Sequence, residues 1–244
     1  MNYPYFQFSG GIFAALLVLV GLFFLFIFLP VSLVTEAFSR LGLTPIQGFL
    51  VFIAILLGRT VNLPIYTSER LVMVPRRRSV QFTMDSMGRA LRVEEEPGNE
   101  LKKQVVALNI GGCILPVLLS ATFLIGLHVS GHAEGLFLWL PFATIIVALG
   151  CYAMSRPDPF TGLKVPLFMP GLMTFLSVYF FVPEPLRPVV AYVAGTLGTL
   201  IGGNLIPLLS PRVRSRIATP EISIGGAGTF GGVFIAGILA VLLA

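Results

Sequence analysis

The chain has 244 residues, of which 56% are hydrophobic and only 11% are charged. Soluble domains carry about 25% charged residues, and a soluble core has no use for this much apolar surface. The composition therefore excludes an ordinary soluble protein and predicts one integral membrane domain over residues 1–244. The formal net charge of +5 does not indicate a nucleic acid partner, because basic loops are typical of the cytoplasmic face of membrane proteins.

Hydrophobic runs of roughly 17–25 residues are long enough to cross a bilayer. The first run follows MNYPYFQFSGG, which contains no Lys or Arg, so we interpret it as a retained helix and not as a cleaved signal. The runs cover residues 11–31, 45–65, 104–126, 135–154, 165–182, 188–209 and 223–243. The predicted fold class is thus all-α, a polytopic bundle of about seven transmembrane helices.

Positive charge is distributed unevenly among the connecting segments. Segments 59–103, 155–164 and 210–217 hold fourteen of the sixteen Lys and Arg residues, and the alternate loops hold only Arg40 and Arg187. The positive-inside rule then places the N-terminus in the cytoplasm and the C-terminus outside. We expect a multi-pass protein of the cytoplasmic membrane, with the lipid bilayer as its partner.

One hydrophilic insert, residues 66–103, interrupts the apolar chain. Within it, SVQFTM and RALRVE flank DSMG at positions 85–88, a sequence typical of a hairpin turn. We therefore predict a small β-hairpin on the cytoplasmic face. The basic run 76–78 either touches anionic lipid headgroups or, with the acidic run 94–96, forms a docking surface for a soluble cytoplasmic partner.

Amides are the polar side chains of interest in the predicted spans, since no Asp or Glu falls inside one. Asn62, Asn109 and Asn204 each lie six to eight residues from a cytoplasmic cation, which corresponds to about 9–12 Å of helix. Thr229 lies at a comparable depth. Because an amide in hydrocarbon must find partners, we expect the three Asn side chains to point into one interior region. This layer is either interhelical hydrogen bonding or a substrate or ion pocket.

Arg59 is the charged side chain placed inside a predicted span. It either extends to the cytoplasmic interface or takes part in the pocket by attracting an anion. His128, His132 and Glu134 have a spacing that zinc ligands can adopt, but they lie in a short outer loop. We interpret them as interfacial polar residues and predict no metal and no cofactor.

Six glycines form two sets with members three or four residues apart. They are Gly195, Gly198 and Gly202, and Gly225, Gly228 and Gly232. Small residues at this spacing let helices approach closely, so we predict that spans 188–209 and 223–243 pack together with Gly198 and Gly228 at a close contact. The alternative is a backbone-lined cavity or phosphate cradle, which the glycine pattern alone does not establish because no strand is predicted before it.

Four segments together carry a resemblance to a known family. They are GRTVNLPIY, VVALNIGGCILPVLL, AYVAGTLGTLIGGNL and SIGGAGTFGGVFIAGILAVLLA, and they resemble a prokaryotic family of multi-pass membrane proteins that is known only as a domain of unknown function. The resemblance implies Asp at the positions of Asn204 and Gly231, a pair similar in principle to the carboxylates of GxGD-type intramembrane aspartyl proteases. This chain has neither Asp.

Two classes of function follow from these features. The first is a small transporter or permease-like protein with a cytoplasm-facing polar pocket, favoured by prolines that interrupt the spans and by the layered amides. The second is a non-catalytic relative of an intramembrane aspartyl protease that acts as a binding or scaffold protein. We assign no catalytic residue, because an aspartyl protease needs two carboxylates that share a proton.

Overall fold

The computed structural model describes residues 10–75, 80–84, 90–94, 99–132, 134–159 and 161–244. The chain divides into two compact units, Met1–Ile53 and Ala54–Ala244. The second unit holds the strands, the predicted amide residues and the main cavity, so it is the part that positions a candidate site.

The first unit is helical. Helix α1 (Gly10–Phe23) continues through the π-helical segment η1 (Phe24–Phe28) into α2 (Leu29–Arg40), and α3 (Pro45–Gly58) begins in the same unit. The 28-residue helix Phe13–Arg40 is the most apolar in the described chain, and no residue of its most apolar window is buried. A helix that is apolar and exposed all round is one that lipid is expected to cover.

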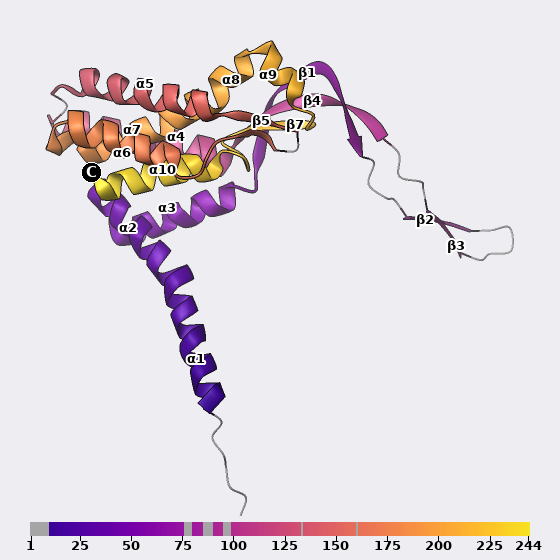
Figure 1. The fold of residues 1–244 in the computed structure, drawn as a ribbon, viewed down its shortest axis with the longest axis horizontal. Coiled ribbons are helices and arrows are strands. Elements are labelled where there is room, and N and C mark those ends of the chain that lie inside the picture. The colour runs from indigo at the N-terminus through magenta and orange to yellow at the C-terminus, as the bar shows by residue number, and fades with distance from the viewer. Residues whose placement is uncertain (1–9, 76–79, 85–89, 95–98, 133, 160) are drawn as a thin grey trace, which may run out of the picture. The chain divides into compact units, whose positions relative to one another are not determined.

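The second unit contains five main helices, which lie side by side in Figure 1. They are α4 (Leu115–Val129), α5 (Leu136–Met154), α6 (Met169–Phe181), α7 (Arg187–Leu200) and α10 (Phe230–Leu243). Shorter pieces extend them: η2 (Ile110–Ile114) before α4, η3 (Glu184–Leu186) before α7, and η4 (Ile201–Leu205), α8 (Ile206–Leu209) and α9 (Pro211–Arg216) after it.

Helix α7 is the centre of this bundle and contacts α4, α5, α6 and α10. In the helix Glu184–Leu209, 72% of the most apolar window is buried, against 33% for Ile110–Val129 and 28% for Leu136–Met154. Small side chains such as Ala191 and Ala194, both fully buried, allow four neighbours to approach one helix. The core of the second unit therefore lies around α7.

A proline follows each of the three π-helical segments by two residues: Pro30 after η1, Pro116 after η2 and Pro207 after η4. A proline lacks an N–H and its ring collides with the carbonyl oxygen four residues earlier. In each case that carbonyl belongs to the π-helical segment, whose wider turn makes room for the ring. The helices thus continue past these prolines with a local bulge.

A three-stranded sheet in the order β1–β4–β7 adjoins the helices of the second unit (Figure 1). Strand β1 (Asn62–Pro75) pairs antiparallel with β4 (Asn99–Asn109), and Asn62 stands opposite Asn109. Strand β7 (Glu221–Ile224) pairs parallel with β4. Two glycines come shortly after each of these parallel strands: Gly111 and Gly112 after β4, before α4, and Gly225 and Gly226 after β7, before α10.

Two further strand pairs are short. Strand β2 (Val80–Met84) pairs antiparallel with β3 (Ala90–Glu94), as predicted for the insert, while the predicted turn at 85–88 lies outside the described residues. Strands β5 (Arg156–Asp158) and β6 (Gly162–Lys164) form an antiparallel ladder between α5 and α6, with Gly162 in the left-handed backbone region at φ 92°.

The predicted all-α fold class is confirmed only in part, because the chain is mostly helical but also contains strands. Each predicted span contains an apolar helix, but only four helices of the described chain are long enough to cross a membrane. The helices in spans 45–65, 165–182 and 223–243 have 14, 13 and 14 residues, fewer than the ~20 that a hydrocarbon core requires. The prediction of about seven transmembrane helices is therefore not confirmed.

Three predicted spans were wrong at the ends that face the sheet. Helix α3 ends at Gly58 and the next helical residue in the described chain after the insert is Ile110, so Asn62 and Asn109 lie on strands and not on helices. The residue before Pro64 is disfavoured in a helix, and Val105 and Val106 favour a strand. In span 223–243 the helix begins only at Phe230, because β7 and a glycine turn precede it.

Candidate functional site

The paired amides Asn62 and Asn109 join the ends of β1 and β4 to the start of η2. The Asn109 Nδ2 group donates to Asn62 Oδ1 and to the Arg59 carbonyl oxygen, each at 2.8 Å. Asn109 Oδ1 accepts the Gly112 N–H at 2.8 Å, and the Ser223 hydroxyl on β7 donates to Asn62 Oδ1 at 2.6 Å. Asn109 is only 1% exposed. We call Asn62, Asn109, Gly112 and Ser223 the amide cluster.

Asn204 lies in the π-helical segment η4 and is also 1% exposed. Its Oδ1 accepts the Gly225 N–H at 3.3 Å and the Thr229 hydroxyl at 3.2 Å. The Gly225 N–H can only donate, so it fixes which end of the amide faces it. The other end, Asn204 Nδ2, has no hydrogen-bond partner in the part of the chain that the structure describes.

The three predicted amides are therefore connected, but not in one direct cluster. Asn62 and Asn109 bind each other, and Asn204 binds the turn between β7 and α10. That turn touches the amide cluster through backbone, because a Cβ at Gly112 would lie 1.9 Å from the Gly225 carbonyl oxygen. Gly225 itself has a positive φ of 74°, which a side chain would strain.

Arg59 lies just beyond the last residue of α3, and it is exposed. Its guanidinium carbon is 5.0 Å from the centroid of the Phe230 ring, at the start of α10. A cation–π contact at an exposed site contributes about 0.5–1 kcal/mol. Because the Arg59 carbonyl also accepts a hydrogen bond from Asn109, this residue links α3 to both the amide cluster and α10.

The glycines of η4 and α7 face two different helices. A Cβ at Gly195 would lie 2.8 Å from the Ala236 carbonyl oxygen on α10. A Cβ at Gly198 would lie 2.7 Å from Val147 Cβ on α5, and one at Gly202 would lie 1.9 Å from the Ala148 carbonyl oxygen. Side chains at these positions would force the backbones apart.

The second set of glycines does not form a helical stripe. Gly225 and Gly228 lie in the turn before α10, and a Cβ at Gly228 would lie 1.9 Å from the Leu163 carbonyl oxygen on β6. Gly232 is on α10, where a Cβ would make ordinary contacts, the nearest at 3.5 Å. The predicted close contact of helices at Gly198 and Gly228 is wrong, because Gly228 is not helical and packs on the ladder.

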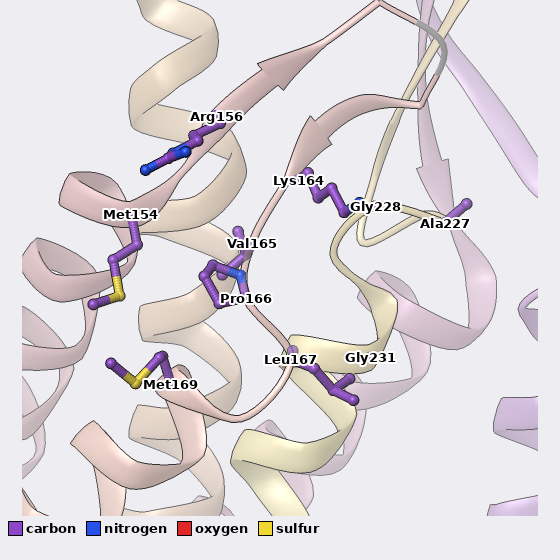
Figure 2. Close-up of a pocket in the computed structure, with 11 residues that line it drawn as sticks. Met154, Arg156, Lys164, Val165, Pro166, Leu167, Met169, Ala227, Gly228 and Gly231 are labelled. Atoms are coloured by element: carbon purple, nitrogen blue, oxygen red, sulfur yellow. The ribbon is translucent and has the colours of Figure 1, made fainter.

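A cavity of about 560 Å³ opens between the end of α5, the β5–β6 ladder, the start of α6 and the turn into α10 (Figure 2). Backbone contacts hold its parts together. The Val165 N–H donates to the Gly228 carbonyl oxygen at 3.1 Å, and the Ser155 hydroxyl donates to the Gly203 carbonyl oxygen in η4 at 2.9 Å. The cavity is thus bounded by elements tied to the segment that carries Asn204.

Two cations border this cavity. Arg156 and Lys164 stand directly opposite each other in the β5–β6 ladder, and both are exposed. Neither forms an ion pair within the described residues. Figure 2 shows the side chains diverging, with Arg156 on the side of Met154 and Lys164 extending toward Gly228. Like charges opposite each other destabilise a strand pair, so this arrangement favours a bound anion.

The start of α10 adds a second source of positive potential. Gly231 and Gly232 line the cavity at the second and third positions of this helix, where N–H groups have no acceptor within the helix. The residue before the helix, Thr229, forms no capping bond, and its hydroxyl donates to Asn204 instead. No acceptor for the Gly231 or Gly232 N–H is found among the described residues.

The cavity was not predicted from the sequence, where Arg156 and Lys164 served only to assign orientation. The sequence RPDPFTGLK nevertheless places these two cations on either side of a turn. That spacing puts them opposite each other in a hairpin. No group of three His, Cys, Asp or Glu side chains that could hold a metal occurs in the described part of the chain.

Long apolar helices, little soluble structure and a cavity at the junction of helices and strands are compatible with an integral membrane protein. Residues 56–243 match the family described as "Protein of unknown function (DUF1614)", and the chain belongs to that family. This confirms the predicted membership of a family of unknown function. No curated protein and no solved structure matches the chain.

Proposed function

We propose that this protein is a small permease-like membrane protein that takes its substrate into the cavity beside the β5–β6 ladder. The observation that carries the proposal is the cavity itself, with about 560 Å³ of space, two cations at its border and apolar walls. Volumes of roughly 300–1,000 Å³ suit small-molecule ligands. A cavity of this kind can hold a small organic anion.

In this proposal the amides support the substrate site and do not line it. Asn204 holds the Thr229 hydroxyl, which leaves the first N–H groups of α10 open toward the cavity. The π-helical segment η4 interrupts the central helix beside the same region, and interrupted helices at a binding site are typical of transporters. A helix with such a bulge can change its local geometry without breaking.

The cavity faces the cytoplasm in the proposed topology, because the ladder lies in one of the three cation-rich segments. Cysteine labelling in intact cells and inverted vesicles tests this orientation. Ser79→Cys, in the hydrophilic insert, is expected to react only from the cytoplasm, and Ser130→Cys, after α4, only from outside. Reaction of both from one side contradicts the topology.

Transport itself is tested by flux. The full chain is reconstituted in phosphatidylcholine vesicles, and efflux of trapped carboxyfluorescein is compared with efflux from protein-free vesicles. We expect flux with the natural chain, a large loss in the double variant Arg156→Gln with Lys164→Gln, and no loss in Lys102→Gln with Lys103→Gln, which removes two exposed cations of β4. Equal flux from all preparations overturns the permease proposal.

The alternative, a non-catalytic relative of an intramembrane aspartyl protease, keeps one supporting observation. Gly231 lines the cavity and Asn204 binds Thr229, so the two positions at which the family resemblance implies Asp both adjoin the start of α10. The double variant Asn204→Asp with Gly231→Asp tests it. Cleavage of a model transmembrane substrate by this variant, but not by the natural chain, supports the alternative, and no cleavage by either counts against it.

A further inference from the structure

We infer that the cavity beside the β5–β6 ladder binds an anionic amphiphile, whose phosphate or carboxylate head lies at Lys164 and the start of α10. The apolar chain of this ligand lies against the opposite wall of the cavity. The inference rests on the proposed function for the choice of site and adds the chemical class of the ligand. It does not require that the ligand is transported.

The head position is assigned by two features from different parts of the chain, Lys164 on β6 and the start of α10. Lys164 has no carboxylate partner within the described residues and extends toward Gly228 in Figure 2. Gly231 and Gly232 have no side chains that could cover their own N–H groups at the start of α10. A helix start carries roughly half a positive charge, and open N–H groups there bind phosphate and carboxylate oxygens.

The charge pair in the ladder makes binding of an anion favourable in a second way. Arg156 and Lys164 repel each other because they occupy one register position of two adjacent strands. An anion at Lys164 and the α10 start neutralises one of the two charges and so weakens this repulsion. No Asp or Glu lines the cavity in the described chain, so the site offers nothing to a cationic ligand.

The opposite wall is apolar and adaptable. Met154 from the end of α5 and Met169 from the start of α6 lie on this wall (Figure 2). Methionine side chains are flexible and polarisable, so they pack against chains of different shape. A cavity with this wall and a cationic border fits a ligand that is both anionic and apolar better than a free inorganic anion.

The test is binding of hexyl phosphate to the full chain in phosphatidylcholine nanodiscs, measured by equilibrium dialysis of the labelled compound. Inorganic phosphate supplies the head alone and hexanol supplies the tail alone. We expect hexyl phosphate to bind saturably and more tightly than either. If hexanol binds as tightly as hexyl phosphate, the assignment of an anionic head is overturned.

Three variants locate the site. Lys164→Gln is expected to weaken hexyl phosphate binding by about tenfold, the loss of one charged hydrogen bond, and Lys102→Gln is expected to leave it unchanged. Met169→Trp fills the apolar side and is expected to weaken hexyl phosphate binding while sparing inorganic phosphate. Equal weakening by Lys164→Gln and Lys102→Gln means that only surface charge is sensed, and it overturns the inference.

Two further arms separate the ligand's source and the two proposals. If phosphatidic acid in the nanodiscs displaces hexyl phosphate, the ligand is a lipid with this headgroup. If it does not, the ligand is a soluble anion. Both results are consistent with the amphiphile site. Saturable hexyl phosphate binding without carboxyfluorescein flux supports the site and rejects the permease. Flux without hexyl phosphate binding rejects the site and keeps the permease.

Discussion

The amide cluster and the cavity beside the β5–β6 ladder both form where helices meet strands. They differ in whether their polar groups have partners within the protein. In the amide cluster, both hydrogens of the Asn109 amide and its oxygen bind protein atoms, and Gly112 and Gly225 bring two backbones into contact. In the cavity, two cations and two N–H groups have no partner among the described residues.

This difference indicates how structural polar groups can be distinguished from candidate functional ones within one fold. A buried polar group that is fully hydrogen-bonded holds elements together, and removing it leaves its partners unsatisfied. A polar group without a protein partner beside a cavity contributes little to stability. Asn204 has a group of each kind, because its Oδ1 accepts hydrogen bonds and its Nδ2 has no partner among the described residues.

The largest effect is expected from a substitution that disrupts the amide cluster. Gly112→Ala places a Cβ 1.9 Å from the Gly225 carbonyl oxygen, a backbone atom that cannot move aside as a side chain can. We expect a loss of unfolding free energy of about 1–3 kcal/mol or more, seen as a lower thermal midpoint in detergent. Gly126→Ala is the matched control, because a Cβ on α4 at that position meets nothing within 4 Å. Equal midpoints for the two variants contradict the close contact.

Next is Asn109→Ala, which removes the centre of the amide cluster. The variant leaves the Arg59 carbonyl and the Gly112 N–H without their partner, so we expect it to lower the unfolding free energy by about 1–3 kcal/mol. Asn62→Ala removes an exposed amide from the same cluster and is expected to have a smaller effect. The comparison is made from unfolding curves in mixed detergent, and a larger effect of Asn62→Ala argues against this description.

An intermediate effect is expected for Asn204→Ala. It removes an acceptor from Gly225 and Thr229, but it also removes an unpartnered buried Nδ2 group. These terms oppose each other, so we expect a smaller loss of stability than for Asn109→Ala, on the order of 1 kcal/mol. Unfolding curves of Asn204→Ala and Asn109→Ala test this order of stability losses. A larger loss for Asn204→Ala shows that its amide has a further partner.

The smallest expected effect is a gain in stability from a substitution at the border of the cavity. Lys164→Gln removes a like-charge pair across the ladder, which is worth roughly 0.2–1 kcal/mol before screening by solvent. We expect a slightly higher thermal midpoint at low ionic strength, and no difference in molar salt where the Debye length is about 3 Å. A clear loss of stability at either ionic strength means that Lys164 has a structural partner.

Local sequence patterns predicted some elements well and others poorly. The hairpin strands β2 and β3 follow from two alternating segments around a turn sequence. Asn62 and Asn109 were placed on helices because a short apolar run bounded by polar residues has the same composition in a buried strand and in a helix end. Their pairing was still anticipated, because a buried amide needs a partner wherever the backbone places it.

The sequence by itself determined that this chain is rich in apolar helices, where its charged segments lie, and that its buried amides need partners. These properties depend on composition and on neighbours along the chain. Only the tertiary structure decided that β7 pairs with β4, that Gly228 packs on β6, and that Arg156 and Lys164 border an empty volume. Each of these contacts joins segments distant in sequence or closes a space between them, so no local pattern specifies it.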